Sequence, residues 1–181
     1  MTGANNKLIV SVDYSQKSNI AVAGGTILLA KDFSTNRRES EPVVCMVIEE
    51  NEHLPVGTFL LVHHNRFSPN SPHHLGGNLY SLAYNESIFA KLGEDGLPIG
   101  LCDNVFVEQV FDNDSPLIPD HLKKPNPFKY KVINDGFGYS KGQVIFCYEF
   151  SNYQIVYIFK GIEHRVIKVK KSDIIGKIAE K

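Results

Sequence analysis

The sequence predicts an all-β protein built from two copies of one small module. Short runs of β-branched and aromatic residues alternate with turn-forming clusters of Gly, Pro, Asn and Asp, and no amphipathic helix of ordinary length interrupts them. Two segments of the first half also recur in the second half at nearly one spacing. Such a repeat is the strongest guide to architecture, because it defines the unit that the chain builds.

The repeat rests on two separate matches. Residues 84–92, YNESIFAKL, align with residues 170–178, KKSDIIGKI, at an offset of 86 positions (170 − 84). Residues 55–61, PVGTFLL, align with residues 140–146, SKGQVIF, at an offset of 85 positions (140 − 55). We therefore expect two tandem units, each a small barrel or sandwich of short strands.

A cluster of turn-forming residues at 94–98 separates the two expected modules, which are residues 1–96 and residues 97–181. Both modules follow one order of elements: a strand, a long loop, a strand, a short turn, a strand preceded by glycine, a hairpin and a closing strand. The expected strands are 7–13, 42–48, 57–63, 79–84 and 88–92 in the first module, and 104–110, 130–133, 142–149, 154–160, 164–169 and 174–178 in the second.

The composition indicates a soluble globular protein. With a formal net charge of −1, the chain lacks the basic field that holds nucleic acid. No apolar run approaches the ~20 residues of a membrane helix, and the N-terminus lacks the apolar segment of a secretory signal. Cys45, Cys102 and Cys147 are scattered singly, which is typical of reduced, buried thiols. We expect a cytoplasmic protein that binds neither nucleic acid nor membrane.

A short basic run, Lys168, Lys170 and Lys171, alternates with valine and isoleucine. Side chains two positions apart on a strand share a face, so this pattern indicates the solvent-exposed face of a strand. A phosphate-binding patch is the alternative interpretation.

The second half resembles the C-terminal half of the GroES-type co-chaperonins, the lids of chaperonin folding chambers. The resemblance is carried by the glycine-led strand at 140–146, the hairpin segment at 161–169 and the Ser-Asp-Ile closing strand at 172–178. In the first half, residues 23–29, AGGTILL, are similar to the Ala-Gly-Gly-aliphatic segment of that family's mobile loop. The tandem arrangement is similar to the double-domain members of the family.

The resemblance implies two tandem GroES-like small β-barrels without catalytic residues or cofactor. It also implies a ring-shaped homo-oligomer that caps a GroEL-like chaperonin ring through a mobile loop, expected here within residues 14–41. Two features depart from the family. The connections at 49–56 and 134–141 are too short for the hairpin that forms its roof, and the second module's loop, 111–127, has only Ser115–Pro119 in place of the Gly-Gly-aliphatic segment.

The candidate chaperonin-binding residues are Gly24, Gly25, Thr26, Ile27, Leu28 and Leu29. The two glycines permit a tight bend that presents three aliphatic positions together. Burying each aliphatic side chain contributes about 1.5–3 kcal/mol, and ordering the loop costs about 2–5 kcal/mol. One loop would bind weakly, whereas a ring of loops would bind well through effective concentration. The alternative is that residues 26–29 form an ordinary buried strand.

Other residue patterns give weaker predictions. His63, His64, His73 and His74 flank a proline-rich loop, but no further ligand completes a tetrahedral set, so we assign no metal and leave open whether they bind one. No nucleophile or phosphate-loop motif is present, which argues against an enzyme. Alternating aromatic residues are expected to pack a core or a subunit seam, with a sugar-binding platform as the rival: Phe146, Tyr148, Phe150, Tyr153, Tyr157 and Phe159.

Two functions follow from these patterns. The first is a co-chaperonin-like lid whose subunits join through their terminal strands, 8–12 and 174–178, because the edges of an open barrel must be covered. The second is a structural or decorating protein, for instance of a phage particle, built on the same barrel without chaperonin activity. The lid is the leading hypothesis, and the missing roof hairpins make the second function a serious alternative.

Overall fold

The structure is a computed structural model, and the described part of the chain is all-β, as the sequence predicts. Apart from two short 3-10 turns, its regular elements are strands, and none is an α-helix. The described residues are 7–13, 21–22, 25–26, 39–40, 42–49, 51–67, 70–112, 119, 123–148 and 153–178.

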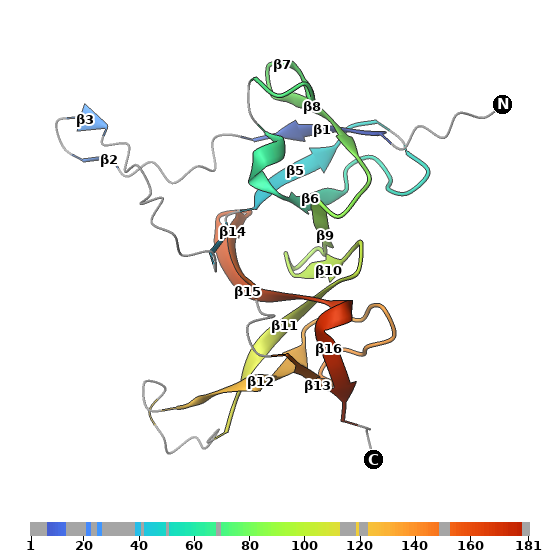
Figure 1. Ribbon diagram of the computed structural model, residues 1–181. Helices are drawn as coiled ribbons and strands as arrows, with labels where there is room; N and C mark the ends of the chain where they lie inside the picture. The colour runs from blue at the N-terminus through green and yellow to red at the C-terminus, as the bar shows by residue number, and fades with distance from the viewer. Residues whose placement is uncertain are drawn as a thin grey trace.

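The first half of the chain forms a seven-stranded sheet in the order β10-β9-β6-β5-β1-β8-β7, drawn in the upper part of Figure 1. A 3-10 turn, η2 (His64–Arg66), follows β6. The strands of this sheet are β1 (Lys7–Val12), β5 (Val43–Val47), β6 (Phe59–Val62), β7 (His74–Gly76), β8 (Leu79–Ala83), β9 (Ile88–Leu92) and β10 (Pro98–Gly100).

The second half forms another seven-stranded sheet, in the order β16-β13-β12-β11-β15-β14-β4. A 3-10 turn, η4 (Lys171–Asp173), connects β15 to β16. The strands of this sheet are β4 (Glu39–Ser40), β11 (Asn104–Phe111), β12 (Pro125–Val132), β13 (Val144–Cys147), β14 (Tyr153–Phe159), β15 (Ile162–Lys170) and β16 (Ile174–Lys177).

Six strands of each sheet follow the same order. Strands β9-β6-β5-β1-β8-β7 of the first sheet correspond one by one to β16-β13-β12-β11-β15-β14 of the second. Each set is also in the same chain order, so the sequence offset has a counterpart in topology. The additional strands differ: β10 joins the first sheet beside β9, and β4 joins the second beside β14 in parallel.

The turn before the third strand of each set is identical in its hydrogen bonds. Gly57 N–H donates to Val47 O at 2.8 Å, and Gly142 N–H donates to Val132 O at 2.8 Å. Both glycines adopt a left-handed backbone conformation, with φ of 86° and 87°. Glycine adopts this conformation without steric cost, which explains why glycine stands at both positions of the repeat.

The closing strand of each set pairs through the same irregularity. The pairing of β6 with β9 shifts register between Leu61 and Val62, and the pairing of β13 with β16 shifts between Phe146 and Cys147. These two positions are 85 residues apart (146 − 61), the offset found for the preceding turn. A β-bulge is a specific local feature of a strand pair, so its repetition extends the match beyond strand order.

Each sheet covers an apolar cluster of its own. Residues alternate along the strands between buried and more exposed positions, as the period of a β-strand requires. Leu8 and Val10 of β1 belong to the first cluster, and Val105 and Val107 of β11, their counterparts in the second set, belong to the second cluster. The two halves therefore bury equivalent strand faces.

A third cluster joins the two sheets. Leu61 and Phe89 of the first sheet pack with Ile155, Tyr157 and Phe159 of the second. In Figure 1 the β14–β15 hairpin runs between the two sheets. The hairpin thus covers the face of β6 and β9 that points away from the first cluster, and the two halves share a core.

The predicted linker is a packed turn between β9 and β10. Gly96 is buried with φ of 79°, and its carbonyl oxygen accepts a hydrogen bond of 2.8 Å from the Tyr157 hydroxyl group of β14. Strand β10 then extends the first sheet to Gly100. The boundary between the modules at residues 96 and 97 stays a prediction, but the turn around it is held by contacts from both halves.

Replacing Tyr157 with phenylalanine tests this turn. Because the variant leaves the buried Gly96 carbonyl group without its donor, we expect the free energy of unfolding to fall by about 1–3 kcal/mol. Urea denaturation measures the change. Tyr153→Phe, on the same strand but only half-buried, is the control and should change stability by about 0.5 kcal/mol or less. Equal losses in the two variants would contradict the assigned role of the Tyr157 hydroxyl group.

Several sequence predictions differ from the structure in detail. Strand β12 begins at Pro125, five residues before its predicted start (130 − 125), and pairs there with Phe111 across a register shift. Strand β1 lies between β5 and β8, so its two edges are already paired and it does not supply the predicted subunit seam. Strand β16 does lie at the edge of its sheet, as that prediction requires.

Candidate functional site

The predicted chaperonin-binding segment is described only in part. Gly25 and Thr26 form β3, which pairs with β2 (Ala21–Val22) in a separate two-stranded ladder. Figure 1 shows this ladder apart from both large sheets. The described part of the segment is therefore not a strand of either sheet. The other predicted residues lie outside the described residues: Gly24, Ile27, Leu28 and Leu29.

The described residues place a different candidate site at the junction of the two sheets. An open cleft of about 590 Å³ lies between η2 and β9 of the first sheet and β14 and β15 of the second. Its size falls within the ordinary range of ligand-binding pockets. The cleft is lined by His63, Arg66, Glu86, Ser87, Phe89, Tyr153, Lys168 and Lys170.

Lys168 is half-buried and lines this cleft. Its Nζ atom lies 4.3 Å from the centre of the Phe89 ring and 5.1 Å from the centre of the Tyr153 ring. These distances allow cation–π attraction to both rings. Burial lowers the pKa of the Lys168 ammonium group, and the nearby charge of Lys170 lowers this pKa further. The sequence prediction of a solvent-exposed lysine is therefore wrong for Lys168.

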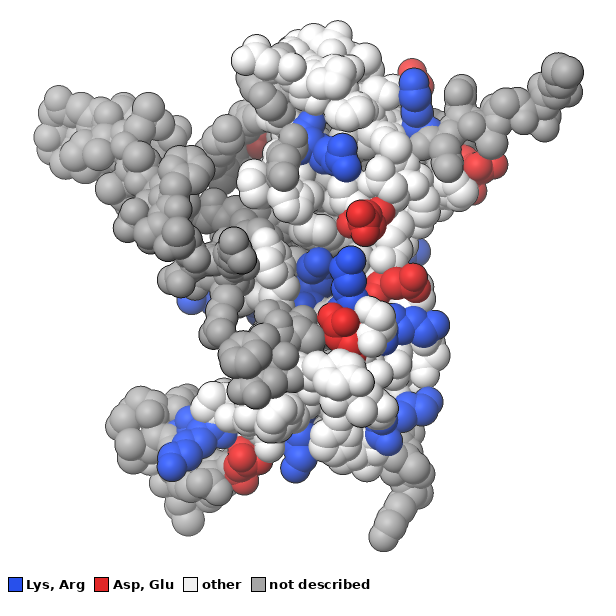
Figure 2. Space-filling view, in the orientation of Figure 1, with Lys and Arg blue, Asp and Glu red and all other residues white. Residues whose placement is uncertain are grey.

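The charge of the cleft is positive. Arg66, Lys168 and Lys170 contribute three cations, against the single carboxylate of Glu86. Lys170 Nζ lies 3.6 Å from a Glu86 carboxylate oxygen, and both side chains are largely exposed, so their attraction is weak. Figure 2 shows blue and red side chains side by side across the middle of this face of the molecule. For Lys168 and Arg66, no ion pair is formed with any other described residue.

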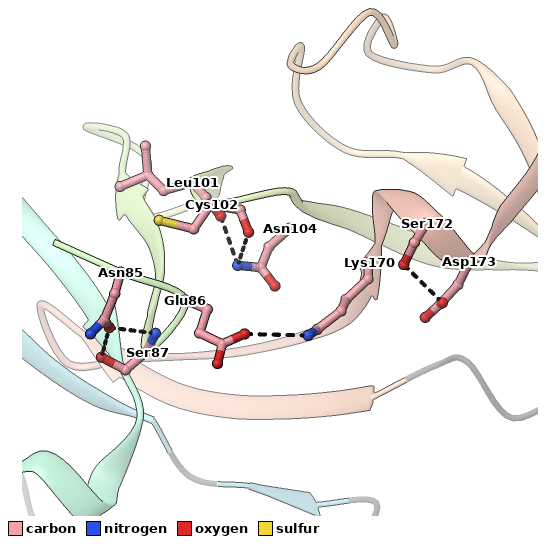
Figure 3. Close-up of polar contacts among 9 residues, drawn as sticks. All are labelled: Asn85, Glu86, Ser87, Leu101, Cys102, Asn104, Lys170, Ser172 and Asp173. Carbon is pink, nitrogen blue, oxygen red and sulfur yellow. Dashed lines mark hydrogen bonds and ion pairs between the residues drawn. The ribbon is translucent and has the colours of Figure 1, made fainter.

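The first-sheet rim of the cleft is held by a hydrogen-bonded turn. The amide and hydroxyl groups of Ser87 donate to the Asn85 side-chain oxygen, at 3.0 Å and 2.6 Å (Figure 3). The Ser87 carbonyl oxygen accepts from the His63 amide group at 2.9 Å. This turn fixes the backbone beside Glu86, so the position of the carboxylate depends mainly on its own side-chain rotamer.

The lysines of the cleft are not a requirement of the repeated fold. Lys168 pairs with Phe106 in the second sheet, and the equivalent pair in the first sheet is Ser81 with Ile9. By the same strand register Lys170 corresponds to Ala83, one position away from Tyr84, which the sequence alignment sets opposite it. The repeated strand therefore accepts small uncharged residues at both positions, and the cationic cleft is a property of this junction alone.

The histidine pairs do not assemble a metal site within the described part of the chain, where no three His, Cys, Asp or Glu side chains come together. The rings of His63 and His64 stack at 4.6 Å between centres. His74 packs against Tyr80, with 4.9 Å between ring centres. The sequence offers no signal beyond these pairs for a metal ligand.

The alternating aromatic residues divide between core and surface. Tyr157 and Phe159 are buried in the shared cluster, which confirms a core role for this pair, and Tyr153 packs beside them. Tyr148 is exposed, and Phe150 lies outside the described residues. A row of exposed tyrosines, which a sugar-binding platform needs, is not found on the described parts of β13 and β14.

The cysteines are free thiols. Cys45 and Cys147 are buried in the two sheet clusters, as the sequence indicates, whereas Cys102 is only half-buried. Burial raises the pKa of the Cys45 thiol, which keeps it protonated.

Fold and cleft together define a class of protein: an all-β chain of two topologically matched sheets with a cationic cleft at their junction. Neither a protein-family model nor a curated protein matches the chain. No helix in the described part is long and apolar enough to cross a membrane.

Proposed function

We propose that this protein is a co-chaperonin-like lid made of two tandem GroES-like small β-barrels. It would cap a GroEL-like chaperonin ring through residues 24–29 and assist protein folding without catalytic residues. One observation carries the proposal: the β2–β3 ladder, which contains Gly25 and Thr26, pairs with neither large sheet and lies in the chain between β1 and β5. This is the position at which the resemblance predicts the chaperonin-binding loop.

The lid would act through many weak contacts. Ile27, Leu28 and Leu29 would enter an apolar groove of the chaperonin, and the free energy of their burial would exceed the cost of ordering the loop by only a few kcal/mol. A ring of such loops binds firmly because the first contact raises the effective concentration of the rest. The lid can then be released when the chaperonin changes conformation.

The contact between the two halves of one chain suggests how neighbouring subunits would join in the proposed ring. Strand β10, which directly precedes β11, covers the outer edge of β9. The corresponding edge strand, β16, has no further strand beside it among the described residues. Ile175 of β16 is 57% exposed, whereas its counterpart Phe89 is buried against the second sheet. A neighbouring chain that repeats the internal contact would cover this edge and this face.

A second candidate function is a structural or decorating protein, for instance of a phage particle. It is favoured by the connections from β5 to β6 (residues 48–58) and from β12 to β13 (residues 133–143), because neither contains a long β-hairpin that could close the roof of a chamber. The same fold would then use its loops for docking only.

The test measures association with a GroEL-like chaperonin from the organism that encodes or hosts this protein. We expect the protein to bind the chaperonin in the presence of nucleotide and to change its ATPase rate, and Ile27→Asp to abolish both effects. Ile162→Asp is the matched control, because Ile162 is 62% exposed at the β14–β15 turn and the substitution is the same. Absence of binding by the unmodified protein would reject the lid and favour the structural role.

A further inference from the structure

The cleft at the sheet junction gathers cations from separate parts of the fold. Arg66 comes from η2, which follows β6, and Lys168 and Lys170 come from the C-terminal end of strand β15. Their side chains line one cleft with a single carboxylate, that of Glu86. With Arg66, Lys168 and Lys170 as cations and Glu86 as the anion, the lining has a formal net charge of about +2 (3 − 1), in a protein whose formal net charge is −1. Positive charge is therefore concentrated here.

We infer that this cleft binds a phosphate group, either free or carried by a small molecule, through Lys168, Arg66 and Lys170. The inference does not depend on the proposed lid function. It assigns to the cleft a ligand whose charge, at −2, matches the charge of the lining.

The half-buried ammonium group of Lys168 favours an anionic ligand. An ammonium group that loses part of its hydration is destabilised unless an opposite charge or hydrogen-bond acceptors replace the water. Two aromatic rings supply part of this replacement, at 4.3 Å and 5.1 Å from Nζ. Rings accept no strong hydrogen bond from the remaining N–H groups, and phosphate oxygens would do so.

Arg66 and Glu86 also favour a phosphate ligand in this cleft. The planar guanidinium group of arginine offers paired N–H donors that match phosphate geometry. Glu86 is the competing anion, but its side chain is 81% exposed and its distance to Lys170 is 3.6 Å. Such a contact is weak enough for a dianion to displace the carboxylate from Lys170 toward solvent.

Comparison of the two repeats also indicates that the two lysines serve binding and not folding. Because Ser81 and Ala83 stand where Lys168 and Lys170 stand in the second set, folding of the repeated strand does not require lysine. The cleft volume of about 590 Å³ exceeds what inorganic phosphate fills, so the natural ligand is a phosphate ester with a further group beside the rim.

Titration calorimetry with inorganic phosphate and with glycerol phosphate, at constant ionic strength, tests the site. We expect saturable binding of both compounds to the full chain, and acetate at the same ionic strength should not compete. In Lys168→Gln and in Arg66→Gln, binding should weaken about tenfold or more, since each loses a charge-assisted hydrogen bond. Lys171→Gln is the matched control, because Lys171 lies beside Lys170 but does not line the cleft, and its binding should stay within about twofold.

Thermal unfolding with and without phosphate provides an independent measurement of binding by the same variants. Phosphate should raise the unfolding temperature of the unmodified protein and of Lys171→Gln, and should leave that of Lys168→Gln unchanged. Without phosphate, Lys168→Gln should be as stable as the unmodified protein, because the substitution removes a half-buried charge. Absence of saturable binding, or equal weakening in Lys171→Gln and Lys168→Gln, would overturn the proposed site.

Discussion

Gly100→Ala should destabilise the protein more than any other glycine-to-alanine substitution at a described position. A Cβ atom added to Gly100 would overlap the carbonyl oxygen of Asn104. The obstacle is backbone, so it cannot rotate away as a side chain would. The turn cannot open easily either, because the amide group of Asn104 donates to Leu101 O at 3.0 Å and its side chain donates to the same oxygen at 2.7 Å.

We expect the loss of free energy of unfolding to exceed about 4 kcal/mol, a large part of the total stability of an ordinary domain. Urea denaturation followed by circular dichroism measures it. Gly136→Ala is the matched control, because a Cβ atom there meets nothing within 4 Å and the backbone is not left-handed. A stability change in Gly100→Ala as small as that of the control would show that the β10–β11 turn does not have the described conformation.

Leu61→Ala should have the second largest effect, because it opens a cavity in the core shared by the two sheets. Leu61 is fully buried, at 0% exposure, and packs in the cluster that includes Phe89 and Tyr157. Removing a buried leucine side chain costs about 2–5 kcal/mol, including the cavity that remains. The β14–β15 hairpin would then be held less firmly against the first sheet.

The repeat offers an internal control for this substitution. Phe146 occupies the position equivalent to Leu61, at the same bulge of the second sheet, but no hairpin among the described residues covers that face of β13, and Phe146 is only half-buried. Phe146→Ala should therefore cost about 1 kcal/mol, although it removes a larger side chain. Equal losses in the two variants would contradict the asymmetric burial of the two matched faces.

The parts of the fold that sequence could predict are those set by local signals. The glycine turns at Gly57 and Gly142 and the closing strands β9 and β16 are encoded by residues close together in the chain, so their spacing revealed the repeat. Strands β4, β7 and β10 were missed because each is two or three residues long. Such a strand exists only through pairing, and a short segment carries too few residues to show a period.

The sequence did not predict the cleft, and the reason is different. Alternation correctly placed Lys168 on one face of β15, the face it shares with Val166. That face is only partly solvated, because Val166 belongs to the core between the two sheets and the Lys168 ammonium group lies over the Phe89 ring. Only the packing of the first sheet against the hairpin decides this burial, and one strand's pattern contains no information about a partner sheet.

The chaperonin-binding segment remains a prediction from sequence. Only Gly25 and Thr26 of its six residues are described, and their ladder with β2 fits a segment outside the two sheets. The aliphatic character of residues 27–29 is the feature that a chaperonin groove would recognise, and side-chain burial in a complex is not encoded in the chain alone.

The most direct test of the lid is hydrogen–deuterium exchange at the amide groups of residues 24–29, with and without a GroEL-like chaperonin and nucleotide. The account predicts rapid exchange in the free protein and strong protection on adding both components, with no such protection in Ile27→Asp. If these amide groups are already protected in the free protein, or if the chaperonin leaves their exchange unchanged, residues 24–29 are not the binding segment of a lid.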